Sequence, residues 1–223
     1  MKVEFLYPEL TNLLGENGTQ MLLKKIFGEQ NCILTNYPAP PRFISEKVTL
    51  VIMGAMTEDK QRLILSLLMP FKERIKDRIE SDQFFFFTGN AMDLLGKTIE
   101  HEEGDTLEAL GFFDFITQVN KYNRKNEFIH GYTDKGTEIF GWISQFTNYK
   151  GERPGFIQSG EKKYGIHYKN LYATSLLGPL LITSPNFTKE LLREMAMKDN
   201  LPEEESLMMS FEKRKEDMKR NTK

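Results

Sequence analysis

The first half of the chain alternates short apolar runs with amphipathic stretches. Four runs have the length and side-chain content of strands: 3–7, 32–35, 48–53 and 84–87. Three stretches place apolar residues at helical spacing: 18–28, 57–69 and 71–79. The continuous apolar runs 48–53 and 84–87 are typical of strands buried on both faces. This alternation of strands and helices predicts an α/β fold with a doubly wound, mostly parallel sheet.

The second half has a different pattern, in which short alternating runs are separated by Gly, Asn and Asp. We expect these runs to be antiparallel strands added to the sheet: 112–115, 127–130, 138–142 and 145–147. A further strand is predicted at 170–175 and a helix at 187–197. The charged tail, 203–223, carries an apolar stripe and is expected to be a docked helix that frays near its end. No repeat or linker is visible, so we predict one domain spanning 1–223.

The charge of the chain is nearly balanced, with 30 Lys and Arg against 32 Asp and Glu in 223 residues. This balance gives no field suited to coating nucleic acid or an anionic membrane. No apolar run reaches about 18 residues, the length of a membrane-spanning helix, and the first residues contain no apolar stretch of signal-peptide length. We therefore expect a cytoplasmic protein without nucleic-acid or membrane partners.

Two sequence features resemble reactive sites but have ordinary explanations. Residues 91–98 fit a loose phosphate-loop pattern, yet leucine and methionine stand where such a loop needs glycine, and acidic residues follow. A short helix that ends at Gly96 explains this pattern. Cys32 is the only cysteine, which excludes an internal disulfide and any Cys-rich zinc site. Because it falls within the predicted strand 32–35, we expect a buried, inert thiol.

The three histidines have no visible partner at ligand or catalytic spacing. His101 begins an acidic run, 101–105, which is better explained as a solvated loop than as a metal site, because no second histidine stands at ligand spacing. His130 and His167 lie in strand-like stretches without a visible Asp or nucleophile partner, and structural roles are expected for both. The sequence therefore predicts no metal ion and no cofactor.

Two longer motifs carry a family resemblance. Residues 89–97 read Gly-Asn-Ala-Met-Asp-Leu-Leu-Gly-Lys, and residues 165–179 read Gly-Ile-His-Tyr-Lys-Asn-Leu-Tyr-Ala-Thr-Ser-Leu-Leu-Gly-Pro. The first resembles the nucleophile elbow of class I glutamine amidotransferases of the cobyric acid synthase type, Cys-Gly-Gly-Tyr-Gln-Leu-Leu-Gly-Lys. The second resembles that family's Gly-Thr-Tyr-Leu-His-Gly-Pro stretch and is especially similar to the glutaminase subunit of lipid II isoglutaminyl synthase. The resemblance covers nearly the whole chain and implies a flavodoxin-like core.

The resemblance also shows which catalytic residues are replaced. Glutamine hydrolysis in that family needs a cysteine thiolate at the elbow and a histidine that carries its proton. The motifs place Gly89 at the cysteine position and Leu177 at the histidine position. A one-residue slip puts Thr88 at the elbow instead, and a threonine without an adjacent base is a poor nucleophile. The oxyanion turn, which is rich in glycine in the family, has Gly54 followed by Ala55. Because loss of the nucleophile alone costs orders of magnitude in rate, glutaminase chemistry is not expected.

Three hypotheses follow from the resemblance. The first is a catalytically degenerate glutamine amidotransferase-like protein that acts as a non-catalytic binding or regulatory partner of a Mur-ligase-like synthetase in peptidoglycan (lipid II) amidation. The second is a sensor that holds a small amino-acid ligand in the former glutamine pocket. Its pocket candidates are Gly54, Ala55, Thr88, Asn90 and Arg124. Arg124 could clamp a carboxylate or pair with a nearby acid. The third is a residual amidotransferase that uses Thr88, Asn90 or Asp93, although Asp93 is expected to face the helix surface.

Overall fold

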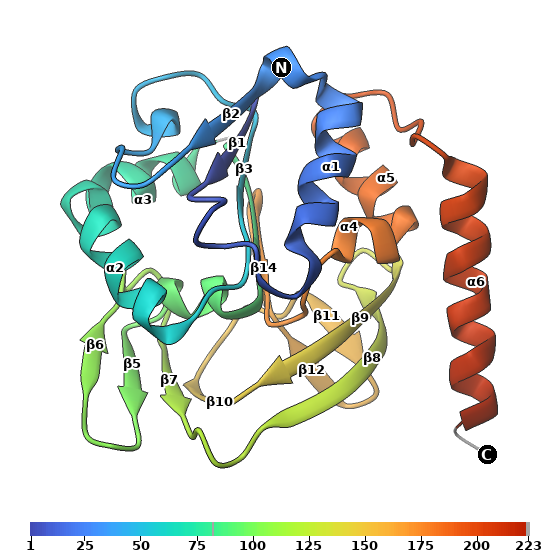
Figure 1. The fold of residues 1–223 in the computed structure, drawn as a ribbon. Helices are drawn as coiled ribbons and strands as arrows, with labels where there is room; N and C mark the ends of the chain where they lie inside the picture. Colours follow the sequence, from blue (N-terminus) through green and yellow to red (C-terminus); the bar gives the residue numbers. More distant parts are fainter. Residues whose placement is uncertain (82, 222–223) are drawn as a thin grey trace.

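The centre of the molecule is a six-stranded sheet, seen in a computed structural model that describes residues 1–81 and 83–221 (Figure 1). Its strands are β1 Val3–Leu6, β2 Cys32–Thr35, β3 Leu50–Met53, β4 Phe84–Thr88, β13 Ile166–Tyr168 and β14 Leu171–Thr174. The strand order is β13-β14-β4-β3-β1-β2, and every pair is parallel except β13 with β14. This order confirms the doubly wound, flavodoxin-like core.

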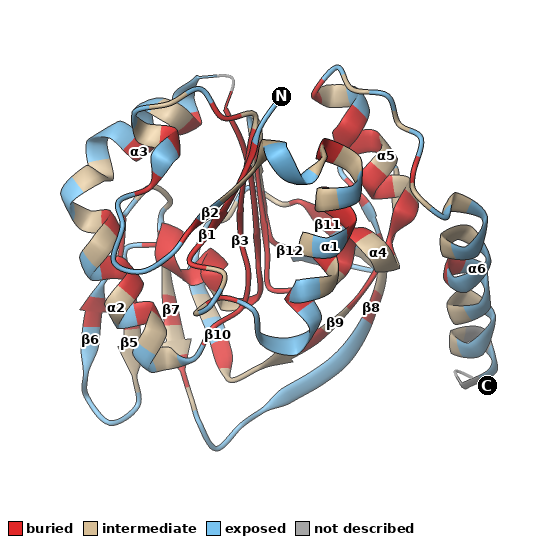
Figure 2. Cartoon of the chain, turned by 45° about the horizontal axis from the view of Figure 1, so that its top comes forward, coloured by how far each residue is buried: buried red, intermediate tan, exposed pale blue. Residues whose placement is uncertain are grey.

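Helices cover both faces of this sheet (Figure 1). One layer contains α1 Glu16–Phe27, α4 Leu180–Thr183 and α5 Pro185–Glu194, and the other contains α2 Glu58–Leu68 and α3 Lys72–Glu80. Phe85 and Phe87 of β4 pack in the core on the α2 and α3 side, whereas Phe84 and Phe86 pack on the α1 and α5 side. The run of four phenylalanines is therefore buried between two helical layers, as Figure 2 shows for the central strands.

Most strands of the second half form two further sheets and do not extend the central one, and all their pairs are antiparallel except β5 with β7. The first, in the order β10-β7-β5-β6, contains β5 Thr98–His101, β6 Thr106–Glu108, β7 Phe115–Val119 and β10 Thr147–Gly151. The second, in the order β12-β11-β8-β9, contains β8 Lys125–Thr133, β9 Glu138–Gln145, β11 Ile157–Ser159 and β12 Lys162–Tyr164. Burial alternates along β7, so this strand covers the core with one face only.

Two expectations about local structure are corrected. The acidic stretch around His101 contains the strands β5 and β6, because Ile99 and Leu107 are buried beneath their charged neighbours. Short 3-10 segments also link the elements: η1 Leu13–Gly15, η2 Glu29–Asn31, η3 Arg42–Ile44, η4 Met69–Phe71 and η5 Gly89–Leu95. Asn170 and Ser175, expected at the ends of a strand, lie just outside β14.

The charged tail forms a long helix, α6 Glu204–Asn221, on the outside of the molecule (Figure 1). Phe211 anchors this helix in the protein with no exposed surface, and the Lys215 Nζ lies 2.7 Å from the carboxylate of Glu138 in β9. Residues 222–223, at the end of the expected tail helix 203–223, lie outside the described residues. No helix among the described residues combines the length and the apolar character that crossing a membrane requires.

Candidate functional site

The carboxyl end of β4 leads directly into a tight turn at Gly89. Gly89 has a φ of +58°, in the left-handed region that glycine adopts readily, and the chain continues as the 3-10 segment η5. The turn lies at the edge of the sheet where α/β proteins hold their sites, at the carboxyl ends of the parallel strands. The structure therefore places Gly89 at an elbow between a strand and a helical segment.

The elbow leaves no room for a side chain at Gly89. A Cβ atom added there would lie 2.6 Å from the Cβ of Ala55 and 3.1 Å from Cδ2 of Leu177. The N–H of Leu177 donates to the carbonyl of Trp142 in β9 over 2.8 Å, which fixes the backbone at this position. The elbow is thus filled by residues that are far apart in the sequence: Gly89, Ala55 and Leu177.

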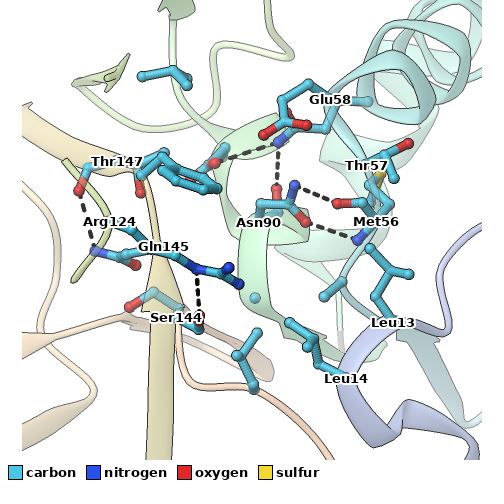
Figure 3. Close-up of a pocket in the computed structure, with 18 of the residues that line it drawn as sticks. Leu13, Leu14, Met56, Thr57, Glu58, Asn90, Arg124, Ser144, Gln145 and Thr147 are labelled. Atoms are coloured by element: carbon cyan, nitrogen blue, oxygen red, sulfur yellow. Dashed lines mark hydrogen bonds between the residues drawn. The ribbon is translucent and has the colours of Figure 1, made fainter. Parts of the chain in front are cut away.

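A cavity of about 170 Å3 adjoins the elbow (Figure 3). Six residues singled out from the sequence line it: Ala55, Gly89, Asn90, Asp93, Arg124 and Leu177. Ligand pockets generally have volumes of about 300–1,000 Å3, so this cavity is small for a substrate site. Among the residues that the structure describes, no histidine or cysteine lines the cavity. The cavity therefore lacks the cysteine and the histidine that the family resemblance implies for glutamine hydrolysis.

Both polar atoms of the Asn90 side chain bind the backbone of Met56 (Figure 3). Its Oδ1 accepts a hydrogen bond from the N–H of Met56 over 2.9 Å, and its Nδ2 donates to the carbonyl of Met56 over 2.8 Å. Met56 follows Ala55 in the turn that was expected to supply oxyanion donors. Since Asn90 already accepts the hydrogen of this N–H, that donor is not free to stabilise a developing oxyanion.

Arg124 lies at the mouth of the cavity, where its side chain is exposed. Its Nε donates to the hydroxyl of Ser144 over 2.9 Å, and its guanidinium lies 5.1 Å from the centre of the Phe146 ring. Within 1–81 and 83–221, no carboxylate lies within ion-pair distance of Arg124. The structure therefore does not show the expected pairing of Arg124 with a nearby acid.

Gly54 and Thr88, both expected in the pocket, face away from the elbow cavity. A Cβ added at Gly54 would lie 2.4 Å from the carbonyl oxygen of Thr11 and 2.5 Å from Cγ of Glu16. Thr88 is buried, and its hydroxyl donates to the Glu16 carboxylate. Side chains alternate along β4, so Thr88 points to the same face as Phe86, on the α1 side. The first turn of α1 places Glu16 there.

Glu16 is a buried acid that the sequence analysis did not identify. It accepts hydrogen bonds from the Thr88 hydroxyl and, over 3.0 Å, from the N–H of Gly178. Burial raises the pKa of its carboxyl to about 7. Thr88 thus has an adjacent base, contrary to the expectation from the sequence. The space beside Glu16, however, is only about 20 Å3, room for about one water molecule, and Thr88 does not line it.

Asp93 is also buried, which corrects the expectation that it faces the helix surface. The hydroxyl of Tyr149 donates to its Oδ1 over 2.9 Å, and Nε2 of Gln61 donates to its Oδ2 over 3.3 Å. Burial raises the pKa of this carboxyl to about 7. The segment η5 packs against β4, β14 and α2, and the Asp93 side chain lies beside Tyr149 of β10. Asp93 therefore joins the elbow segment to the antiparallel half.

Both remaining strand histidines have carboxylate partners that the sequence did not reveal. Nδ1 of His167 lies 2.7 Å from the carboxylate of Asp134, and its ring stacks on Tyr172 at 4.1 Å between centroids. Nε2 of His130 lies 2.7 Å from the carboxylate of Glu138. Neither histidine lines the elbow cavity. Their partners come from other turns and strands, so local spacing could not indicate them.

Cys32 is half-buried, less enclosed than expected, because it lies in the edge strand β2. Burial still raises the pKa of its thiol. Strands β1 and β3 separate β2 from β4, so Cys32 is remote from the Gly89 turn. In the part of the chain described by the structure, no three His, Cys, Asp or Glu side chains form a group that could hold a metal ion.

The chain has a glutamine amidotransferase-like α/β fold. A solved glutamine amidotransferase matches this fold with a TM-score of 0.60 at 14% identity, and the match covers 88% of this chain and 100% of that one. No family model matches the chain.

Two curated relatives carry a particular name, lipid II isoglutaminyl synthase (glutamine-hydrolyzing) subunit GatD. The protein of Staphylococcus aureus (strain N315) is 29% identical over 169 residues, which is 70% of this chain and 68% of the relative. The protein of Streptococcus pneumoniae (strain ATCC BAA-255 / R6) is 24% identical over 208 residues, which is 86% of this chain and 79% of the relative.

Proposed function

We propose that this chain is a catalytically inactive glutamine amidotransferase-like protein that binds a Mur-ligase-like synthetase and serves peptidoglycan (lipid II) amidation. The closed elbow carries the proposal, because the space for a side chain at Gly89 is filled by Ala55 and Leu177. The relatives support the pathway, since their name describes a subunit of a glutamine-hydrolyzing synthase. The motif at 89–97 supports the cobyric acid synthase type within this class.

Three components of acyl transfer are missing together. Glycine at the elbow has no nucleophilic atom, and Leu177 has no atom that could carry a proton. The N–H of Met56, in the turn that faces the elbow, already donates to Asn90. These contributions act as a unit, so the loss of all three leaves binding as the function that the fold can still perform.

A sensor for a small amino-acid ligand is the second candidate, and one observation favours it. Arg124 presents a guanidinium at the cavity mouth with no carboxylate neighbour among the described residues, which suits a ligand carboxylate. The volume of about 170 Å3 argues against it, since only a very small ligand would be enclosed. Stabilisation by glutamine or glutamate that Arg124→Ala removes would establish this role.

The proposed function is tested by producing the chain together with the Mur-ligase-like synthetase of its source organism. We expect a complex that co-elutes in size-exclusion chromatography and amidates its substrate with ammonium but not with glutamine. The matched variant is Thr88→Ala, which removes the hydroxyl that donates to the buried carboxylate of Glu16. Ammonia release from glutamine above a blank, abolished by Thr88→Ala, would overturn the inactive assignment. Failure of the two chains to associate would overturn the partner role.

A further inference from the structure

A second, larger cavity lies between the two smaller sheets. Its volume is about 370 Å3, within the range of about 300–1,000 Å3 that ligand pockets occupy. Strands β8, β9, β10 and β12 supply most of its wall, and we call it the basic cleft. It shares a wall with the elbow cavity, formed by Gln145, Thr147, Tyr149 and Ser175.

The charges of the basic cleft are strongly unbalanced. Its lining contains four cationic side chains, Lys125, Arg153, Lys162 and Lys163, and one acidic side chain, Glu127. Within the described residues, none of the four cations has a carboxylate at ion-pair distance. Like charges gathered in one cavity repel one another, and an anionic ligand would offset this repulsion.

Two of the cations have neutral contact partners, and the buried carboxylate of Asp93 also attracts Arg153. The guanidinium of Arg153 is half-buried and lies 4.2 Å from the centre of the Tyr149 ring, which fixes its plane. The ammonium of Lys125, in β8, donates to Oδ1 of Asn148, in β10, and so bridges the two sheets. A guanidinium stacked on a ring still presents N–H groups at its edge, where they can bind two oxygens at once.

We propose that the basic cleft binds a diphosphate group, either free or carried by a nucleoside. Arg153 matches the oxygen geometry of a phosphate bidentately, and Lys162 and Lys163, on the exposed strand β12, supply point charges for the second phosphate. This binding is independent of the function proposed above, because it uses no residue of the closed elbow and no partner chain.

The test is isothermal titration calorimetry of the full chain with inorganic pyrophosphate and, separately, with ADP. The double variant Lys162→Gln/Lys163→Gln should weaken the binding at least tenfold. Lys150→Gln is the matched control, since Lys150 is exposed on β10 but does not line the cleft. Arg153→Lys keeps the charge and removes the planar fork, so it should also weaken binding if a shaped site is present.

The two ligands distinguish the two sources of the diphosphate. Tighter binding of pyrophosphate than of ADP identifies the free anion, and the reverse identifies a nucleotide. Absence of heat with both ligands at millimolar concentration would overturn the proposal. Equal weakening by Lys150→Gln and by the double variant would also overturn it, because general surface charge would then account for the binding.

Discussion

Gly89→Ala tests whether the elbow is closed to side chains. The new Cβ would lie 2.6 Å from the Cβ of Ala55 and 3.1 Å from Cδ2 of Leu177. Carbon atoms in contact are normally about 3.5–4.0 Å apart, so the neighbours would have to move. The φ of +58° at Gly89 also disfavours alanine. We therefore expect a loss of stability from two separable causes.

The two causes can be assigned magnitudes. A left-handed conformation costs about 1–2 kcal/mol for a residue with a Cβ. Overpacking of a buried site costs about 1–3 kcal/mol, which gives a sum of about 2–5 kcal/mol for Gly89→Ala. Gly160→Ala is a matched control, because Gly160 has a φ of +56° and an added Cβ there meets no atom within 4 Å. The control should show the conformational cost alone.

The assay is urea denaturation followed by the fluorescence of Trp142, the single tryptophan. A double-mutant cycle adds Ala55→Gly, which removes the nearest clashing atom. The double variant Gly89→Ala/Ala55→Gly should recover most of the packing cost and keep the conformational cost. If Gly89→Ala lowers the free energy of unfolding no more than Gly160→Ala does, the elbow is open and the reasoning is refuted.

Three further predictions concern buried groups. Burial raises the pKa of Glu16 from 4.5 to about 7, so between these pH values the folded state keeps a proton that the unfolded state has released. The free energy of unfolding should therefore fall by up to about 3 kcal/mol as the pH rises from 4.5 to about 7. Glu16→Gln should flatten this part of the pH profile. Tyr149→Phe removes the hydroxyl that donates to the buried Asp93 and should cost about 1–3 kcal/mol in urea denaturation. Phe86→Ala, at a side chain with no exposed surface, should cost about 3–5 kcal/mol and lower the thermal midpoint in calorimetry.

Each of these predictions has an exposed counterpart as its control: Glu205→Gln, Tyr122→Phe and Phe128→Ala. Surface substitutions of this kind generally change stability by less than about 0.5 kcal/mol. A pH profile for Glu16→Gln that is parallel to that of the wild type would contradict the assignment of the buried proton. Equal costs within the tyrosine pair or within the phenylalanine pair would contradict the burial on which the other two predictions rest.

The central sheet could be predicted because its signals are local. A run such as Phe84–Phe87 needs two apolar faces, and the helices that supply them are neighbours in the chain with their own periodic pattern. Strands β5 and β6 were missed because each buries a single apolar residue amid charged ones, Ile99 and Leu107, which is too weak a pattern to recognise.

The candidate site was predictable in its position but not in its interior. Motif spacing was sufficient to expect an elbow at Gly89, since such a turn follows its strand directly. The burial of Glu16 and of Asp93 could not be recognised, because an isolated acid in a sequence is usually solvated. Their burial depends on partners from distant elements, such as Gly178 for Glu16 and Tyr149 for Asp93.

The contact of Gly89 with Ala55 and Leu177 also has an evolutionary consequence. Substitutions arise one at a time, and no single one of them opens a route to a nucleophile at this turn. Gly89→Cys alone meets the Cβ of Ala55, Ala55→Gly alone adds no reactive atom, and Leu177→His alone has no thiol to serve. Since each first step is either destabilising or without benefit, a nucleophile at this turn requires coordinated substitutions at several positions.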